Sequence, residues 1–390
     1  MNDYDVIVVG GRVAGASTAL LLARAGLRVA VLERSRRGTD TVSTHGLMRG
    51  GVLQLSRWGV LPDLVAAGTP AIHSTVFHYG DGGTTHVSLR SSPGVDGLYA
   101  PRRWLLDRVL VDAAAAAGAD VRHETPVVGL LRADDGRVVG VRVRGAGGAD
   151  VPVRAPLTVG ADGISSVVAA EVGAEFLSRG RSASAILYRY VGDVPSEGYV
   201  WGYGDGAGGG LIPTNDGQTC VFVGTTPARM RALRARGADA AFDALLDALP
   251  ASLSALVRAA GPSGRLHGWR GVPGHVRRSY GPGWALVGDA GYFKDPITTH
   301  GLTDALRDAE LLADAVLAED TISPAVAMAR YQATRDRLSR DLVEVTEAVC
   351  RYDWDGDRIR TLLRRVSAAM SDEMDHLSAR QQQLTSALPR

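Results

Sequence analysis

The chain has 390 residues, and 43 basic against 42 acidic residues leave a formal net charge of +1. This length predicts roughly two to four domain-sized units, while 45% hydrophobic and 22% charged residues exclude a wholly disordered chain. The balanced charge gives no electrostatic basis for binding nucleic acid or an acidic membrane surface.

Cysteine content and hydropathy predict a soluble cytoplasmic protein. Cys220 and Cys350 are too few for a disulfide framework, and they lack metal-ligand spacing. No apolar run approaches the roughly 20 residues of a membrane-spanning helix. The start at Met1–Asp5 has no basic segment, so we expect no signal peptide and no membrane span.

The N-terminal region has the pattern of a nucleotide-binding strand–helix–strand unit. Tyr4–Val9 is an apolar run typical of a buried parallel strand, and the turn Gly10–Gly15 opens an apolar helix. Arg28–Leu32 is a second apolar strand, with Glu33 at its end. Such a turn brings backbone N–H groups to a pyrophosphate, and the acidic residue accepts hydrogen bonds from a ribose. Arg12 replaces the second glycine of the usual pattern, so an ordinary turn is the alternative.

The remaining elements alternate between hairpins, helices and short buried strands. In chain order we expect strands over Ile72–Tyr79 and Thr84–Leu89, a helix over Arg103–Ala117, strands over Val127–Leu131, Arg137–Val143 and Leu157–Gly160, and mostly strands from Ala183 to Val223. We then expect helices over Ala228–Ala235 and Ala238–Leu249, a strand over Trp284–Val287, and amphipathic helices over Ser323–Tyr352 and Asp357–Leu388.

Nucleotide-binding patterns therefore recur along the chain, with β-rich inserts between them. This order predicts an α/β fold with a discontinuous Rossmann-like domain made of residues 1–70, 101–175 and 277–325. Residues 71–100 and 176–276 are expected to form an inserted β-sheet substrate domain, and residues 326–390 a C-terminal helical region that covers the nucleotide-binding domain.

Several short motifs follow the glycine turn in a characteristic order. They are Arg103-x-x-Leu106-Asp107-x-x-Leu110, Ala161-Asp162-Gly163 and Gly288-Asp289. Together they resemble the group A flavoprotein monooxygenase superfamily, the para-hydroxybenzoate hydroxylase-like FAD-dependent oxidoreductases. Residues 295–301 resemble the loop that lies at the flavin ring in that family, and they are called the flavin loop below. The resemblance implies that the Rossmann-like domain binds FAD.

The resemblance also implies which residues contact FAD. Asp289 would bind ribityl or ribose hydroxyls, and Asp162 would lie near the pyrophosphate and the nicotinamide cofactor. The backbone N–H groups of the flavin loop would stabilise negative charge at the N1 and O2 edge of the flavin. The predicted cofactor-binding set is Gly10, Arg12, Val13, Ala14, Gly15, Glu33, Arg34, Arg103, Val127, Asp162, Asp289, Pro296, Thr299, His300, Gly301 and Leu302.

Three positions depart from the family pattern. Ala169 stands where the Asp-Gly segment usually closes with an arginine, which predicts weaker binding of a pyridine nucleotide. Thr298-Thr299 replaces the usual Gly-Gly, so the backbone of the flavin loop is stiffer. Arg12 could supply positive charge to the pyrophosphate, or it could be an outward, solvated side chain.

Three side chains near the expected flavin are candidate catalytic residues. His45 lies in the segment that runs past the flavin in this family, where it could bind flavin or substrate or act as a base, unless it is a surface-loop histidine. His300 lies inside the flavin loop, where its role could be only positional. Lys294 is the one lysine of the chain. Its ammonium could stabilise an anionic reduced flavin or a peroxide, or its presence could reflect composition alone.

A candidate substrate-binding face follows in the β-rich insert. Tyr199, Trp201 and Tyr203 alternate along one strand, so their side chains share one face of the sheet. They could line a flat apolar pocket, with Pro213 at its rim, or they could belong to an inter-domain core.

The resemblance implies an FAD-dependent monooxygenase that hydroxylates or epoxidises an aromatic or polycyclic small molecule, in the manner of natural-product biosynthesis. NAD(P)H would reduce the flavin, O₂ would add at C4a, and the resulting hydroperoxide would transfer one oxygen atom. A separate flavin reductase is an alternative source of electrons. A reductase of carbon–carbon double bonds, similar to geranylgeranyl reductases, or a flavin oxidase would share the fold. A nucleotide-binding protein without redox activity is the alternative from another class.

Overall fold

The computed structural model describes residues 3–145, 148–196, 198–261, 263–318 and 322–386. A six-stranded sheet with the order β17-β18-β9-β1-β2-β5 forms the centre of the nucleotide-binding half. Its strands are β1 (Val6–Val9), β2 (Val29–Leu32), β5 (Asp120–Arg122), β9 (Leu157–Gly160), β17 (Tyr280–Gly281) and β18 (Trp284–Leu286). The strands from β18 to β5 are parallel, and β17 is antiparallel to β18. The predicted Rossmann-like α/β arrangement is confirmed.

Both faces of this sheet are covered, which explains why β1 is apolar throughout. Val6 and Val8 face a cluster with helices α1 (Val13–Arg24), α4 (Arg103–Ala116) and α9 (Gly301–Leu317). Ile7 and Val9 face a second layer, because successive side chains of a strand point to opposite sides. That layer contains β6 (Val127–Arg132), β7 (Val138–Arg144), β8 (Asp150–Arg154) and α5 (Val167–Glu171). Two short helices, α2 (Arg49–Arg57) and α3 (Leu61–Ala66), complete this half.

A seven-stranded sheet forms the other half, with the order β15-β11-β14-β13-β12-β3-β4. Its strands are β3 (Ser74–Tyr79), β4 (Thr84–Ser88), β11 (Ala185–Gly192), β12 (Tyr199–Gly204), β13 (Ala207–Pro213), β14 (Gln218–Thr225) and β15 (His267–Trp269). Both β-rich inserts thus contribute to one sheet. Its outer face packs on a helical layer made of α6 (Pro227–Arg234), α7 (Ala238–Asp247) and α8 (Ala251–Arg258).

A small three-stranded sheet joins the two halves. It pairs β10 (Phe176–Arg179) with β16 (His275–Arg277), and β16 with β19 (Tyr292–Phe293). The start of the expected substrate domain therefore pairs outside the seven-stranded sheet. The strand β19 leads directly from the Gly288-Asp289 turn to the flavin loop, so this small sheet fixes where the loop begins.

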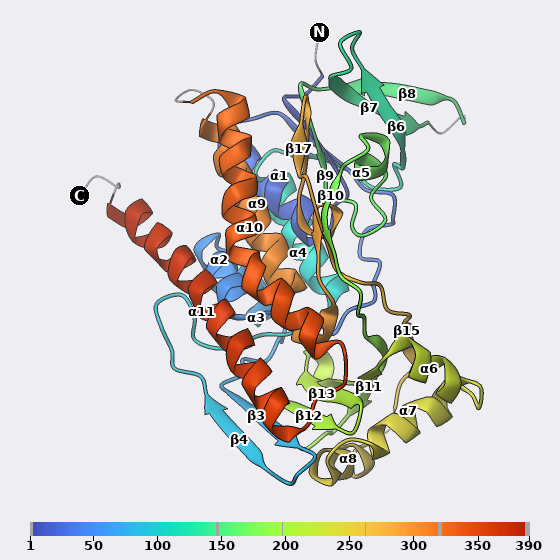
Figure 1. Ribbon diagram of the computed structural model, residues 1–390. Coiled ribbons are helices and arrows are strands. Elements are labelled where there is room, and N and C mark those ends of the chain that lie inside the picture. Colours follow the sequence, from blue (N-terminus) through green and yellow to red (C-terminus); the bar gives the residue numbers. More distant parts are fainter. Residues whose placement is uncertain (1–2, 146–147, 197, 262, 319–321, 387–390) are drawn as a thin grey trace.

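The C-terminal helices lie against both halves rather than covering the nucleotide-binding domain alone. Helix α10 (Pro324–Val349) runs beside α9, and α11 (Gly356–Ser386) crosses from α2 to the seven-stranded sheet (Figure 1). Their apolar residues join the inner face of that sheet in one core cluster. The end of the second predicted amphipathic stretch, residues 387–388, lies outside the described residues, as do Met1 and Asn2.

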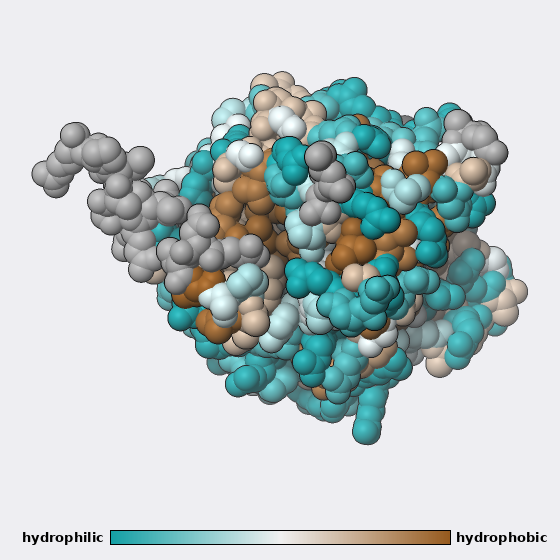
Figure 2. Space-filling model, turned by 90° about the horizontal axis from the view of Figure 1, so that it is seen from above, coloured by the Kyte–Doolittle hydropathy of each residue, from teal (hydrophilic) through white to brown (hydrophobic). Residues whose placement is uncertain are grey.

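The surface is mainly hydrophilic, with separate apolar patches on the face seen in Figure 2. The large apolar side chains that are exposed are Val42, Val65, Val87, Val151, Val167, Leu177, Leu317 and Val326. They come from many different elements. None of the helices described here is long and apolar enough to cross a membrane.

Candidate functional site

Three segments meet at the carboxyl ends of the central parallel strands, where ligands bind in open α/β sheets. They are the glycine turn after β1, the Gly288-Asp289 turn after β18, and the start of α9. Gly288 has φ +56°, and a Cβ atom built on it would lie 3.0 Å from the Cβ of Ala14 in α1. Glycine is required here because the turn is left-handed and packs directly on the first turn of α1.

The N-terminus of α1 is open to an anion. Arg12 occupies the N-cap position without a side-chain capping bond, and the first turn contains no acidic residue. Beside it, Glu33 accepts hydrogen bonds from the backbone N–H of Gly11 at 2.7 Å and of Ser35 at 2.8 Å. Burial opposes ionisation of Glu33, but these bonds outweigh it and lower its pKa below the ordinary value. A carboxylate is thereby held at the glycine turn.

A pocket opens at this end of the site. Its lining includes Gly11, Arg12, Glu33, Arg36, Arg37, Asp107 and His123. Arg103 pairs with Asp107 at 3.0 Å, and burial raises the pKa of Asp107. A carboxylate that can accept hydrogen bonds from ribose hydroxyls, next to arginines that can face phosphates, fits the adenosine half of FAD.

Of the predicted cofactor-binding residues, Arg12 and Glu33 line this pocket, and Arg103 pairs with Asp107 of its lining. Val13, Ala14 and Gly15 form the first turn of α1, which Gly10 precedes. Arg34 is exposed and lies outside the pocket lining, and Val127 begins β6 in the layer behind the sheet.

The two predicted aspartates lie at the ends of neighbouring strands, β9 and β18. Asp162 accepts the backbone N–H of Val167 at 2.6 Å, which turns the chain into α5. Its Oδ1 is buried and has no partner among the described residues, as expected for a group that awaits a ligand. Asp289 is half-buried beside α9, and burial raises its pKa to about 6.

Ala169, the position of the family's usual arginine, is buried in α5 and packs in the core behind the sheet. A guanidinium at this position would have to leave that core.

The flavin loop is held by short-range and cross-domain bonds. Asp295 accepts the N–H of Ile297 at 3.0 Å and the N–H of Ser184 in front of β11 at 2.6 Å. Thr299 ends the following turn, Pro296–Thr298, with φ +53°. Threonine is branched at Cβ, so this left-handed conformation is strained, and glycine is the residue that fits it without strain.

His45 is in a second left-handed position, with φ +66°, and it lies next to the flavin loop. A Cβ atom built on Gly46 would collide with the Thr299 side chain, so the segment after His45 packs on the loop. The His45 ring is buried, and its Nε2 hydrogen-bonds the Tyr190 hydroxyl from β11. Burial lowers the pKa of His45 to about 3, so its ring is neutral. The surface-loop alternative for His45 is wrong.

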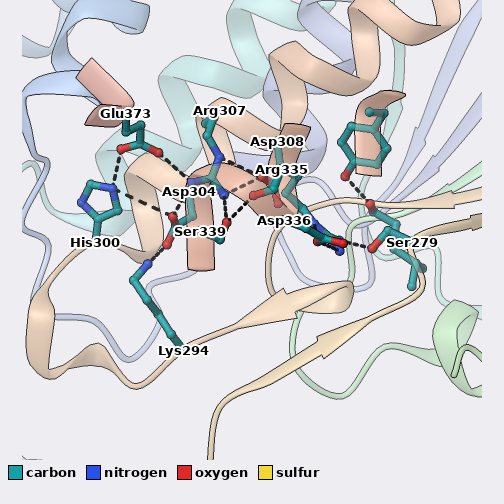
Figure 3. A network of polar contacts seen from close by, with 12 residues as sticks. Ser279, Lys294, His300, Asp304, Arg307, Asp308, Arg335, Asp336, Ser339 and Glu373 are labelled. Carbon is teal, nitrogen blue, oxygen red and sulfur yellow. Dashed lines mark hydrogen bonds and ion pairs between the residues drawn. The ribbon is translucent and has the colours of Figure 1, made fainter. Parts of the chain in front are cut away.

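A buried ionic network lies behind the flavin loop (Figure 3). Arg307 of α9 donates to Glu373 of α11 at 2.7 Å, to Asp308 at 2.8 Å and to Asp304 at 3.0 Å. His300, at the N-cap of α9, donates through Nε2 to the other oxygen of Glu373 at 2.5 Å. Although burial opposes ionisation of Glu373, its contacts with His300 and Arg307 hold its pKa well below the usual range.

Lys294 belongs to the same network. Its ammonium forms an ion pair with Asp304 and lies 5.2 Å from the centre of the Tyr292 ring. Burial, with Arg307 nearby, lowers the pKa of Lys294 to about 7. The lysine therefore points into a network of charges at the base of the flavin loop.

His300, Asp304 and Glu373 lie close enough to share a metal ion. However, Lys294 already pairs with Asp304, and Arg307 pairs with both carboxylates. A metal ion would have to displace these cations, so the donor set fits an ionic network better than a metal site.

The partners in this network were not foreseen from the sequence. Asp304, Arg307 and Asp308 carried a usable signal, because they are charged residues within a helix that is largely buried. Glu373 carried none, because it lies 73 positions from His300 on a helix of mixed charge.

The aromatic face of the seven-stranded sheet is a packed core in this structure. Tyr199, Trp201 and Tyr203 are all buried in the cluster that contains the C-terminal helices, and Tyr203 lies 5.6 Å from Trp354 between ring centres. Ile297 of the flavin loop belongs to the same cluster. Pro213 ends β13 and does not line the pocket at the glycine turn.

A second pocket opens between α10 and the small sheet, beside the start of the flavin loop. Its lining includes Arg179, Arg181, His275, Lys294, Asp295, Glu344, Glu347 and Arg351. This lining is charged, unlike the flat apolar pocket that the aromatic strand predicted.

Comparisons with known proteins identify the family. Residues 3–346 match the model of the FAD binding domain family. The chain belongs to this family, and it is an FAD-dependent oxidoreductase. It is 30% identical to digeranylgeranylglycerophospholipid reductase 1 of Methanopyrus kandleri, over 89% of this chain and 90% of the relative.

Solved structures share the fold at lower identity. The complex of P. aeruginosa PqsL with 2-aminobenzoylacetate superposes with a TM-score of 0.77, at 24% identity over 94% of this chain and 99% of that chain. The p-nitrophenol 4-monooxygenase PnpA from Pseudomonas putida gives 0.76, at 20% identity over 97% of each chain.

Proposed function

We propose that this protein is an FAD-dependent monooxygenase that transfers one oxygen atom of O₂ to an aromatic or polycyclic small molecule. The observation that supports this choice is the aromatic inner face of the seven-stranded sheet above the flavin loop. Tyr188, Tyr190, Tyr199, Trp201, Tyr203 and Phe222 share one cluster with Ile297 of the loop. These rings pack on one another and on the C-terminal helices, so the substrate would bind at the edge of the cluster, where Tyr188 stacks with the half-buried His267. Ring contacts at that edge would favour a flat aromatic substrate over an aliphatic chain.

The residues of the chain would bind and orient FAD, which would supply the electron-transfer and oxygen-activating chemistry when bound. The glycine turn, Glu33 and the arginines of the first pocket would hold the adenosine and pyrophosphate. Asp289 would accept hydrogen bonds from the ribityl or ribose hydroxyls. The start of α9, with the backbone N–H groups of the flavin loop, would stabilise negative charge on the ring, and the packed aromatic cluster would exclude water.

Reduction of a carbon–carbon double bond is the second candidate function. It is favoured by the similarity to a digeranylgeranylglycerophospholipid reductase over nine-tenths of that relative's length. This activity would require a binding site for a long isoprenoid chain, and reduced FAD would deliver two electrons without consuming O₂.

One experiment separates the two functions. The FAD-loaded protein is reduced with dithionite without air and is then given aromatic or isoprenoid test compounds, with or without ¹⁸O₂. Conversion only in the presence of O₂, with one labelled oxygen in the product, supports the monooxygenase. Conversion without O₂ and a gain of two hydrogens supports the reductase. A protein that cannot be reconstituted with FAD would overturn both.

The source of electrons is a separate part of the proposal. Arg12 intrudes into the glycine turn, and no guanidinium is present at position 169, so we expect NAD(P)H alone to reduce the flavin slowly. Substrate binding would accelerate the step, or a separate flavin reductase would supply the electrons. Anaerobic stopped-flow bleaching of the flavin band, with and without test compounds, measures this. Fast reduction without substrate would contradict the expectation.

A further inference from the structure

Two buried imidazole rings flank the contact between the His45 segment and the flavin loop. His45 precedes Gly46, and His300 follows Thr299, the two residues that pack on each other. Each ring is 1% exposed, and each has one nitrogen bound to a partner from a distant element. The other nitrogen, Nδ1 in both rings, is buried and has no hydrogen-bond partner among the described residues.

The partner of His45 determines which nitrogen of its ring carries the proton. Burial keeps the Tyr190 hydroxyl protonated by raising its pKa, and this hydroxyl hydrogen-bonds no described residue other than His45. Arg102 lies over the Tyr190 ring at 3.6 Å and offers only donors. The hydroxyl proton therefore goes to His45 Nε2, which leaves the ring proton on Nδ1. His45 presents a donor.

The partner of His300 has the opposite effect. Glu373 is ionised and can only accept, so His300 donates to it through Nε2. Burial lowers the pKa of His300, which keeps the ring neutral and leaves Nδ1 as an acceptor. The two unpartnered nitrogens thus have complementary hydrogen-bonding character.

We propose that His45 and His300 are a neutral donor and acceptor pair for the flavin, fixed in opposite tautomers by Tyr190 and Glu373, the positioning residues. The inference rests on the proposed binding of FAD. A flavin ring carries both carbonyl acceptors and an N–H donor, so one ring can satisfy both orphaned nitrogens. The left-handed backbone of His45 fits this role, because strained residues persist where binding requires them. His45 then acts as a donor and not as a base.

The groups that face His45 support a neutral ring. Arg103, Arg102 and His267 disfavour a positive charge on His45, whereas Asp40 favours it. Desolvation is larger than any of these effects. No proton uptake by His45 is therefore expected near neutral pH.

Nitrogen-15 NMR of histidine-labelled protein tests the tautomers directly, before and after addition of FAD. We expect His45 to be protonated on Nδ1 and His300 on Nε2, with both rings unchanged across neutral pH. Tyr190→Phe should give His45 a mixture of tautomers and leave His300 unaltered. Tyr188→Phe is the matched control, because the Tyr188 hydroxyl contacts the Ser43 N–H at 3.3 Å and does not contact His45. A wild-type His45 protonated on Nε2, or a Tyr190→Phe variant with no tautomer change, would overturn the proposal.

FAD titration tests whether His45 contributes to flavin binding. His45→Ala should weaken FAD about three- to tenfold, the value of one buried hydrogen bond. His45→Asn should retain most of the affinity, because asparagine tolerates the left-handed backbone and its amide N–H₂ takes the place of Nδ1–H. Equal affinity in wild type and His45→Ala would contradict the role of His45. If the wild-type chain binds no FAD, the proposed function fails, while the NMR result still decides the tautomers.

Discussion

The glycine turn and the flavin loop are the two ends of one proposed cofactor site, yet different parts of the chain hold them in place. At the glycine turn, Glu33 is fixed by backbone N–H groups 22 and two positions away. At the flavin loop, His300 and Arg307 are fixed by Glu373 of α11, 73 and 66 positions away. Local backbone bonds leave Glu33 available for a ligand, whereas the long-range network ties the loop to the folding of the C-terminal helices.

From this comparison we expect that breaking the ionic network lowers the free energy of unfolding more than it lowers the affinity for FAD. Glu373→Gln should lower the free energy of unfolding by about 3–5 kcal/mol, because it leaves the buried Arg307 with one carboxylate fewer. Urea denaturation measures the change. Asp372→Asn, an exposed neighbour on the same helix, is the control and should change stability by less than about 0.5 kcal/mol. Similar stabilities for the two variants would show that α11 does not support the loop.

The difference between local and long-range contacts also explains which parts of the structure the sequence could predict. Val6–Val9, the glycine turn and Glu33 form a compact pattern whose partners are close in the chain, so the nucleotide end and the parallel sheet were predictable. Hydrophobic periodicity also predicted α10 and α11, but it could not show that their inner residues join the seven-stranded sheet. The partners of Lys294 and His300 depend on how the helices pack, and no spacing in the sequence encodes that contact.

Substitutions of the acidic residues that would bind the FAD hydroxyls are expected to lower the affinity for FAD. Glu33→Ala and Asp289→Ala should each weaken FAD at least about tenfold, because each removes charge-assisted hydrogen bonds of about 1.5–3 kcal/mol. Equilibrium titration of flavin fluorescence measures the affinity, and circular dichroism checks the fold. Arg231→Ala sharpens the test, because Arg231 is exposed on α6, lines neither pocket and should change little. Unchanged affinity in both acidic-site variants would refute the motif assignment.

Lys294 belongs to the ionic network and also directly precedes the flavin loop. Lys294→Met should lower the flavin reduction potential, because the ammonium favours an anionic reduced flavin. The shift should be small, since Asp304 already neutralises much of the charge. Asp304 keeps Arg307 as a partner, so we expect a stability loss of only about 1–3 kcal/mol. Potentiometric titration, with Lys294→Arg as the charge-retaining control, tests the sign, and an unchanged potential would leave Lys294 a structural residue.

The smallest effect concerns the backbone of the flavin loop, where two adjacent threonines provide their own control. Thr298 and Thr299 are both buried, but only Thr299 has a left-handed φ. Thr299→Gly relieves strain of about 1–3 kcal/mol, which offsets the lost side-chain packing and the extra freedom of the unfolded glycine. We expect its net change in unfolding free energy to stay within about 1 kcal/mol.

Thr298→Gly gains no such relief, and it also loses the hydrogen bond between the Thr298 and Thr346 hydroxyls at 3.1 Å. It should therefore be less stable than Thr299→Gly by about 1–3 kcal/mol in the same urea titration. If the two variants lose equal stability, the strain at Thr299 is not stored in its backbone. The conformation of the flavin loop would then depend on the ionic network with α11 alone. The flavin loop would depend still more on long-range contacts than the glycine turn does.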